Sequence, residues 1–289
     1  MLWFFLALLT AFASASEAAL AKLWLKEART LEFIAVPFFY SLPLYIVLLA
    51  LLPEITIKPG FWTVLVWMVP LNALGSIFTF WAVRLSPLSL SMPFMSFTPI
   101  VVIGVAHFFL GETPGAWGVA GIVIVVVGSY ILNLDGENRK SFWGPIKAIT
   151  REPGSMLMLL AATIFGFTAV FGKKLILLSS PMHSAAIFFS IHNSIVVAAF
   201  LCTGRVRVPI LVKRPFAGAV IGGSMFLHVC CHFWAISMVA AAYMIAIKRM
   251  NGLFGVLYGA VVFKERNMRY RMTGVLIMTV GAAIIALLG

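Results

Sequence analysis

The sequence predicts an all-α membrane protein with ten transmembrane helices, and three observations support this fold class. First, the 289-residue chain is 62% hydrophobic and only 10% charged, whereas soluble domains carry about 25% charged residues. Second, its apolar runs reach the length of about 20 residues that a helix needs to cross a bilayer. Third, the second half of the chain repeats the pattern of the first. A transmembrane β-barrel would instead alternate apolar and polar residues.

Gly, Pro and charged residues separate the apolar runs, and each run is a candidate span. The predicted spans are 2–22, 31–52, 61–83, 87–110, 115–134, 155–178, 183–203, 216–238, 240–263 and 271–288. The first of them has the composition of a secretory signal peptide but lacks its basic start. We expect it to be retained as a helix, because the repeat requires it.

The internal repeat becomes visible when the chain is shifted by 153 positions. The matched pairs are Phe80-Trp81-Ala82 with Phe233-Trp234-Ala235, Glu112 with Glu265, Gly121 with Gly274 and Gly128 with Gly281. Each half holds five spans, so the second half enters the membrane in the opposite sense. Inverted repeats of this kind are typical of secondary transporters, which bind substrate between the halves near mid-membrane.

The repeat predicts three parts of the chain. Residues 1–134 form the first five-helix repeat and residues 155–289 form the second. The polar segment 135–154 is expected to be a cytoplasmic or interfacial linker.

Each half resembles an EamA domain of the drug/metabolite transporter superfamily. The resemblance rests on the aromatic-Ala run that closes the third helix, on the Gly-Glu or Lys-Glu end of the fourth, and on a Gly-rich fifth helix. It covers essentially the whole chain. It implies ten helices around a central cavity, alternating access by the two halves, and a small-molecule substrate that the family itself does not name.

Basic residues predict the orientation in the membrane. Nearly all loop Lys and Arg residues follow odd-numbered spans, and the opposite loops hold only Lys58. The positive-inside rule then places the odd loops in the cytoplasm and both termini outside, in a multi-pass protein of the cell inner (plasma) membrane. Many relatives of this architecture are thought to have both termini inside, so this sequence departs from them.

The two adjacent cations Lys248 and Arg249 are the strongest candidates for a substrate site. They lie in a predicted continuous helix over 240–263, and charges inside a membrane span are costly. Their repeat partners are Met95 and Ser96, so one half alone supplies them. Both side chains suit a phosphate or carboxylate. The alternatives are a structural ion pair and snorkelling to the surface.

The Lys-Arg pair resembles the one in the ninth helix of the triose-phosphate/phosphate translocators, where it helps to bind phosphate. The resemblance implies an organic anion, with a phosphorylated metabolite as one form. It also makes Lys173 or Lys174 a third cationic member of the site. Asn251 is a further candidate beside the pair.

Histidines lie at a similar predicted depth. His228 and His232 are four residues apart and share a helix face, and His192 lies in the preceding span. We expect them to hydrogen-bond substrate or exchange protons, with simple packing as the alternative. No matching third ligand is present, so no metal site is predicted.

Glu17 is the candidate for proton coupling. It resembles the acid in the first helix of the small multidrug resistance family, and its alternative is a structural partner for Lys22. This residue also supports a rival function, the export of amino acids or amphipathic cations. A second rival is a flippase for an anionic lipid head group.

Several functional classes lack support in the sequence. No nucleotide-binding loop or catalytic motif is present, so we expect no enzyme activity and no cofactor. The net charge of +12 follows from loop residues and does not indicate a nucleic-acid partner. The expected partners are the lipid bilayer and a small substrate, with monomer and homodimer both open. Glu112 and Glu265 are expected to cap the helix that follows each of them.

Overall fold

In the computed structural model of the chain, all regular secondary structure among the described residues is helical, and the residues that it does not describe are 87–90, 135–142, 144–145, 147–151, 205 and 265–268. The first half holds α1 (Leu2–Trp24), α2 (Thr30–Leu51), α3 (Phe61–Leu85), the 3₁₀ helix η1 (Met92–Phe97), α5 (Thr98–Leu110) and α6 (Ala116–Asn133). The second half holds α8 (Pro153–Leu178), α9 (Pro181–Cys202), the short α10 (Val208–Val212), α11 (Pro215–Met238), α12 (Ala241–Lys248), α13 (Asn251–Val261) and α14 (Arg269–Leu288).

Nine helical segments in the described part of the chain are long and apolar enough to cross a membrane. They match nine of the ten predicted spans, and the split pair α12 and α13 occupies the remaining one. The fold class predicted from the sequence is therefore confirmed. The prediction of a continuous helix over 240–263 is wrong, because the helix is interrupted at Arg249 and Met250.

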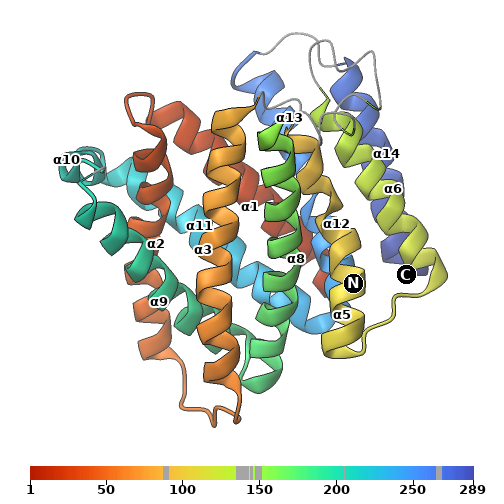
Figure 1. Ribbon diagram of the computed structural model, residues 1–289, viewed down its shortest axis with the longest axis horizontal. Helices are drawn as coiled ribbons and strands as arrows, with labels where there is room; N and C mark the ends of the chain where they lie inside the picture. Colours follow the sequence, from red (N-terminus) through yellow and green to blue (C-terminus); the bar gives the residue numbers. More distant parts are fainter. Residues whose placement is uncertain (87–90, 135–142, 144–145, 147–151, 205, 265–268) are drawn as a thin grey trace.

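Helix packing follows the symmetry of the repeat. The contact of α3 with α8 has its counterpart in the contact of α11 with α1, and α5 packs on α8 as α13 packs on α1. Figure 1 shows α3 and α8 side by side in front of α1 and α11. Two further main contacts, α2 with α9 and α6 with α14, pair equivalent helices of the two halves, whereas the extensive contact of α2 with α11 has only a slight counterpart in that of α9 with α3.

Four glycines allow α6 and α14 to approach closely. A Cβ atom at Gly121 would lie 2.9 Å from the carbonyl oxygen of Gly281, and one at Gly281 would lie 2.7 Å from that of Gly121. Gly128 and Gly274 oppose each other in the same way, at 2.8 and 2.7 Å. Small residues at such crossings permit backbone contact between membrane helices. The glycines that reveal the repeat in the sequence thus form the joint between its halves.

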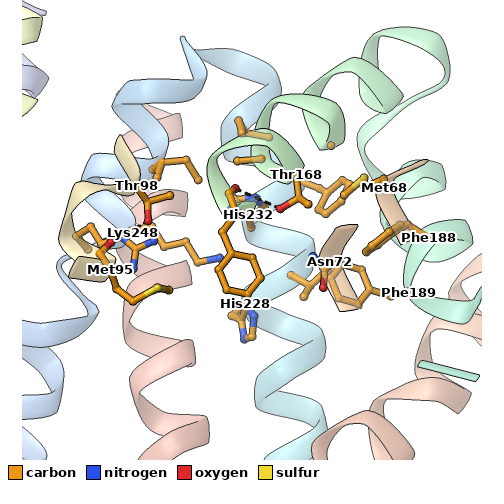
Figure 2. Close-up of a pocket in the computed structure, with 18 residues that line it drawn as sticks. Met68, Asn72, Met95, Thr98, Thr168, Phe188, Phe189, His228, His232 and Lys248 are labelled. Carbon is orange, nitrogen blue, oxygen red and sulfur yellow. Dashed lines mark hydrogen bonds between the residues drawn. The ribbon is translucent and has the colours of Figure 1, made fainter. Parts of the chain in front are cut away.

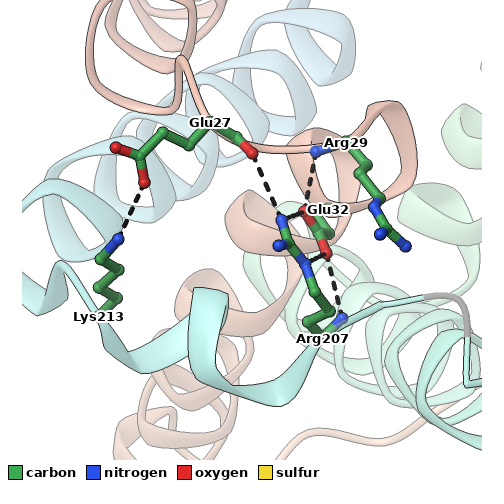
Figure 3. A network of polar contacts seen from close by, with 5 residues as sticks. All are labelled: Glu27, Arg29, Glu32, Arg207 and Lys213. Carbon is green, nitrogen blue, oxygen red and sulfur yellow. Dashed lines mark hydrogen bonds and ion pairs between the residues drawn. The ribbon is translucent and has the colours of Figure 1, made fainter.

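A polar network closes the end of the bundle where α1 meets α2 (Figure 3). The carboxylate of Glu32 has no exposed surface and accepts bonds from Arg207 Nε at 2.6 Å and Nη2 at 2.8 Å. The backbone N–H of Arg29 donates to the same carboxylate at 2.8 Å. Glu27 and Lys213 form a second, exposed ion pair of 2.9 Å nearby. The network ties the first half to the α9–α11 connection of the second.

Candidate functional site

The interruption between α12 and α13 is a short stretch of tightened helix. The N–H groups of Arg249, Met250, Gly252 and Leu253 donate to carbonyls three residues back, at 2.9 to 3.1 Å. In the first half, the equivalent position is the junction of η1 with α5, where the backbone is also a 3₁₀ helix. A 3₁₀ stretch within a helix often marks a functional position, and interrupted helices are typical of transporter binding sites.

A cavity of about 290 Å³ lies beside this interruption, and we call it the central cavity. Helices α3, α5, α8, α9, α11 and α12 all contribute to its walls, so both halves of the chain enclose it. Its volume lies at the lower end of the range of about 300–1,000 Å³ for ligand sites. The cavity therefore suits a small solute.

The basic side chains of the central cavity come from α11, from the end of α12 and from the interruption that follows it, and we call this part of the lining the nitrogen-bearing wall. It holds Lys248, Arg249, His228 and His232, four of the residues that the sequence singled out. Nε of Arg249 and Nδ1 of both His228 and His232 are buried without a hydrogen-bond partner among the described residues. Buried polar groups are nearly always hydrogen-bonded. Nδ1 of His228 lies 3.0 Å from the Glu17 carboxylate, so Arg249 and His232 are the two groups that a ligand in the cavity would satisfy.

The opposite wall is apolar. Figure 2 shows Lys248 and Met95 on one side of the cavity and Met68, Phe188 and Phe189 on the other. The amide of Asn72 lies among these apolar residues. The cavity is thus two-sided, with cations at one end and an aromatic surface with one amide at the other.

Glu17 lies next to the nitrogen-bearing wall. Its Oε2 is 3.0 Å from Nδ1 of His228, close enough for an ion pair when the histidine is protonated, although the two groups are not aligned as a hydrogen bond. Both side chains are mostly buried, with 20% and 14% of their surface exposed. Two titratable groups, from α1 and α11, therefore meet at the interface of the halves.

Lys173 is engaged elsewhere. It forms an ion pair with Glu112 and donates a hydrogen bond to the carbonyl of Val239 at 2.6 Å. Glu112 also accepts from the N–H of Ala241 at 2.7 Å. The expectation that Glu112 caps the following helix is wrong: it caps α12 of the other half, because the inverted fold brings these helix ends together. Glu265 lies outside the described residues.

Two further candidates lie away from the central cavity. Lys174 lines a separate, mostly apolar groove of about 600 Å³ between α3, α5 and α8. His192 is only 2% exposed and stacks on Phe188, with ring centroids 5.4 Å apart. Its Nδ1 lies 3.3 Å from the amide oxygen of Asn193. The geometry gives neither residue a place in the cavity.

Asn251 lines a second cavity of about 380 Å³, which we call the α13 cavity. This cavity lies between α1, α6 and α13, and Arg249 and Met95 line both cavities. Of the predicted site residues, four thus line the central cavity, and Asn251 lines the α13 cavity on the other side of Arg249.

Sequence reasoning missed three polar residues of the central cavity, Asn72, Thr98 and Thr168. Asn72 is an amide within an apolar span, which is a detectable signal. Thr98 begins α5 opposite the interruption, at the repeat position of Asn251. In the described part of the chain, no group of three or more His, Cys, Asp or Glu side chains could hold a metal ion.

Comparison with known proteins identifies a matching family and a solved structure with a similar fold. The model of the EamA-like transporter family matches residues 1–134 and again residues 152–287. A crystal structure of a protein with 16% sequence identity superimposes with a TM-score of 0.73, covering 99% of this chain and 96% of that one. At this identity the likeness shows the fold alone. A search of curated proteins finds no match.

Proposed function

Because the chain belongs to the EamA-like transporter family, and is thus a multi-pass membrane transporter, we propose that it moves a small organic anion by alternating access. The observation that carries the proposal is the wall formed by Lys248 and Arg249. Among the described residues, neither side chain forms an ion pair, and both face the cavity that the two halves enclose. Leaving two charges unpaired inside a membrane protein is costly. An anionic substrate supplies the missing partner.

The balance of charge supports an anion over a cation. The described residues that line the central cavity include two basic side chains, Lys248 and Arg249, and no carboxylate. Glu17 does not line the cavity, and its closest charged contact is with His228 at 3.0 Å. A cationic substrate would have to lie against Lys248 and Arg249, which disfavours the rival function of cation or amino-acid export.

The hydrogen-bond donors of Lys248 and Arg249 indicate the chemical form of the anion. Arg offers a planar fork for two oxygen atoms and Lys offers a point charge, a combination that fits a phosphate or carboxylate group. The wall of Met68, Phe188 and Phe189 fits a short apolar remainder. A phosphorylated metabolite or a small carboxylate matches both walls.

Proton movement through Glu17 is the proposed coupling. Its contact with His228 joins a carboxylate and an imidazole at the interface of the halves, so a proton gained or lost there changes the charge next to the substrate. Glu17→Gln would abolish the response of transport to an imposed pH gradient, while leaving exchange of anion for anion. Loss of both would contradict this role for Glu17.

The anion proposal is tested by thermal stabilisation of purified protein with anionic, cationic and neutral solutes. We expect anions alone to raise the melting temperature, and Lys248→Ala and Arg249→Ala to abolish the rise. Lys174→Ala is the matched control, because it removes a cation from outside the cavity. Stabilisation by cations that depends on Glu17 would overturn the proposal and favour the export reading.

The same thermal-stabilisation experiment distinguishes a transporter of soluble anions from a flippase for an anionic lipid. A head-group flippase would respond to an anionic lipid but not to the free head group in water. Stabilisation by inorganic phosphate or a phosphate monoester therefore supports a soluble substrate. We place the protein in the cell inner membrane with both termini outside, which a reporter active only outside the cell, fused after Gly289, would check.

A further inference from the structure

The α13 cavity has the chemistry of a second anion site, which the central cavity does not explain. Its lining includes the amides of Asn133 and Asn251, the hydroxyls of Ser96 and Ser129, and the cations Lys22, Arg249 and Arg271. None of the described residues that line it is a carboxylate. Its composition is therefore both polar and strongly basic.

Arg249 stands between the two cavities. With Met95 it forms the part of the lining that they share. Its Nε atom is buried and has no partner in the described part of the chain. One guanidinium group has five N–H donors in a fixed fork, so it can hold an anion on either side. Arg249 can therefore contact an anion in either cavity.

The far side of the α13 cavity leads to one end of the bundle. Lys22, at the end of α1, and Arg271, at the start of α14, line it there. The Lys173–Glu112 pair lies at the opposite end, where α5 ends and α12 begins. The α13 cavity thus extends from Arg249, which it shares with the central cavity, toward the end of the bundle that carries Lys22 and Arg271.

Glycine keeps the α13 cavity open. Gly252, Gly255 and Gly259 of α13 all line it. A Cβ atom at Gly255 would meet no atom within 4 Å, so the space in front of it is empty rather than packed. Gly255 is exposed, so a side chain placed there extends into the open space at the edge of the cavity without straining the helix.

We propose that the α13 cavity is a second subsite for the transported anion, sharing Arg249 with the central cavity. The subsite rests on the proposed function and deepens it: the substrate, a carboxylate or phosphate compound, occupies two positions in turn. Arg249 serves both positions, whereas Lys248 serves the central one alone.

The test uses Gly255→Leu, which fills the second subsite and leaves the central cavity unchanged. Gly104→Leu is the matched control, because Gly104 is another helical glycine with nothing within 4 Å and lines neither cavity. Binding is read by the thermal stabilisation that inorganic phosphate and succinate give to the purified full chain. Transport is read by counterflow of the same two radiolabelled anions in liposomes.

We expect Gly255→Leu to keep its stabilisation by anion while counterflow falls at least about tenfold. Gly104→Leu should keep both. Wild-type counterflow in Gly255→Leu would overturn the subsite while leaving the proposed function intact. Wild-type protein that neither binds nor moves either anion would contradict the proposed function and the subsite together.

Discussion

Lys173 of α8 forms an ion pair with Glu112, which follows α5 in the other half of the repeat. The pair also binds the backbone on either side of the α11–α12 connection, through the carbonyl of Val239 and the N–H of Ala241. A second link lies close by, where the N–H of Gly115 donates to the Tyr243 hydroxyl at 3.0 Å. The two halves are thus joined by polar contacts at the end of the bundle where α5 ends.

Glu112→Gln should destabilise the protein, because it leaves the buried ammonium of Lys173 without its counter-charge. Breaking one partner of a buried pair costs about 3–5 kcal/mol, and we expect about 2–4 kcal/mol because 17% of the Glu112 side chain is exposed. Thermal unfolding of the purified variant in detergent measures the loss.

The double variant Glu112→Gln with Lys173→Met provides the control. Removing both charges relieves the unpaired ammonium, so it should recover much of the stability lost by Glu112→Gln alone. Additive losses in the double variant would show that the two residues act independently.

Gly128→Ala should destabilise the joint between α6 and α14. The added Cβ would lie 2.7 Å from the backbone nitrogen of Met278 and 2.8 Å from the carbonyl oxygen of Gly274. Neither backbone atom can move aside cheaply, and overpacking typically costs about 1–3 kcal/mol. The melting temperature of the variant measures the effect.

Gly104→Ala is the control for this substitution. Its Cβ would meet nothing within 4 Å, and alanine is the better helix former. Its melting temperature should equal or exceed that of the wild type. Equal losses in the two variants would show that the close crossing of α6 and α14 is not the cause of the loss.

Glu32→Gln should cost far more stability than Glu27→Gln. The Glu32 carboxylate is fully buried and accepts from both Arg207 and the backbone, so we expect a loss of about 2–4 kcal/mol, reduced because Arg207 is half exposed. Glu27 lies on the surface with Lys213, and both side chains are more than half exposed. Unfolding of the two variants side by side tests the contrast.

The stability of the wild type and of Glu27→Gln should also be compared as the pH is lowered. The hydrogen bond and charge of Lys213 lower the pKa of Glu27 from its ordinary value of 4.5. A lowered pKa means that the stability from this pair is present at neutral pH and is lost as the pH falls through the folded-state value. The wild type should therefore show a small loss in acid that Glu27→Gln lacks, and identical acid profiles would contradict it.

The sequence predicted the fold because its signals are local and repeated. Composition indicates a membrane protein, and the pairs Gly121 with Gly274 and Gly128 with Gly281 indicate two equivalent halves. It could not predict that Gly121 faces Gly281 across the joint, because that requires the direction in which the helices cross. The interruption at Arg249 was missed for a related reason: no Pro marks it, and only the backbone shows the tightened turn.

The candidate site was predicted in part. Lys248, Arg249, His228 and His232 were singled out as polar residues in apolar spans, and they share one cavity. The same reasoning singled out Lys173 as well. The depth of a residue along its helix does not show whether a carboxylate on another helix forms an ion pair with it. Glu112 is that partner, and it lies 61 positions away along the chain. His192 failed to reach the cavity because helical depth says nothing about the direction of a side chain.

Asn72→Leu should weaken substrate binding without unfolding the protein. Asn72 is the amide on the apolar side of the central cavity, and leucine preserves its bulk while removing its hydrogen-bonding groups. A hydrogen bond to a charged group contributes about 1.5–3 kcal/mol, so we expect KM for phosphate counterflow to rise by at least about tenfold with little change in melting temperature. Ser76→Ala is the matched control: Ser76 lies one turn along α3, outside the cavity, and its exposed hydroxyl only donates to the carbonyl of Asn72 at 3.0 Å. An unchanged KM in Asn72→Leu would remove this amide from the site and leave binding to the Lys248–Arg249 wall alone.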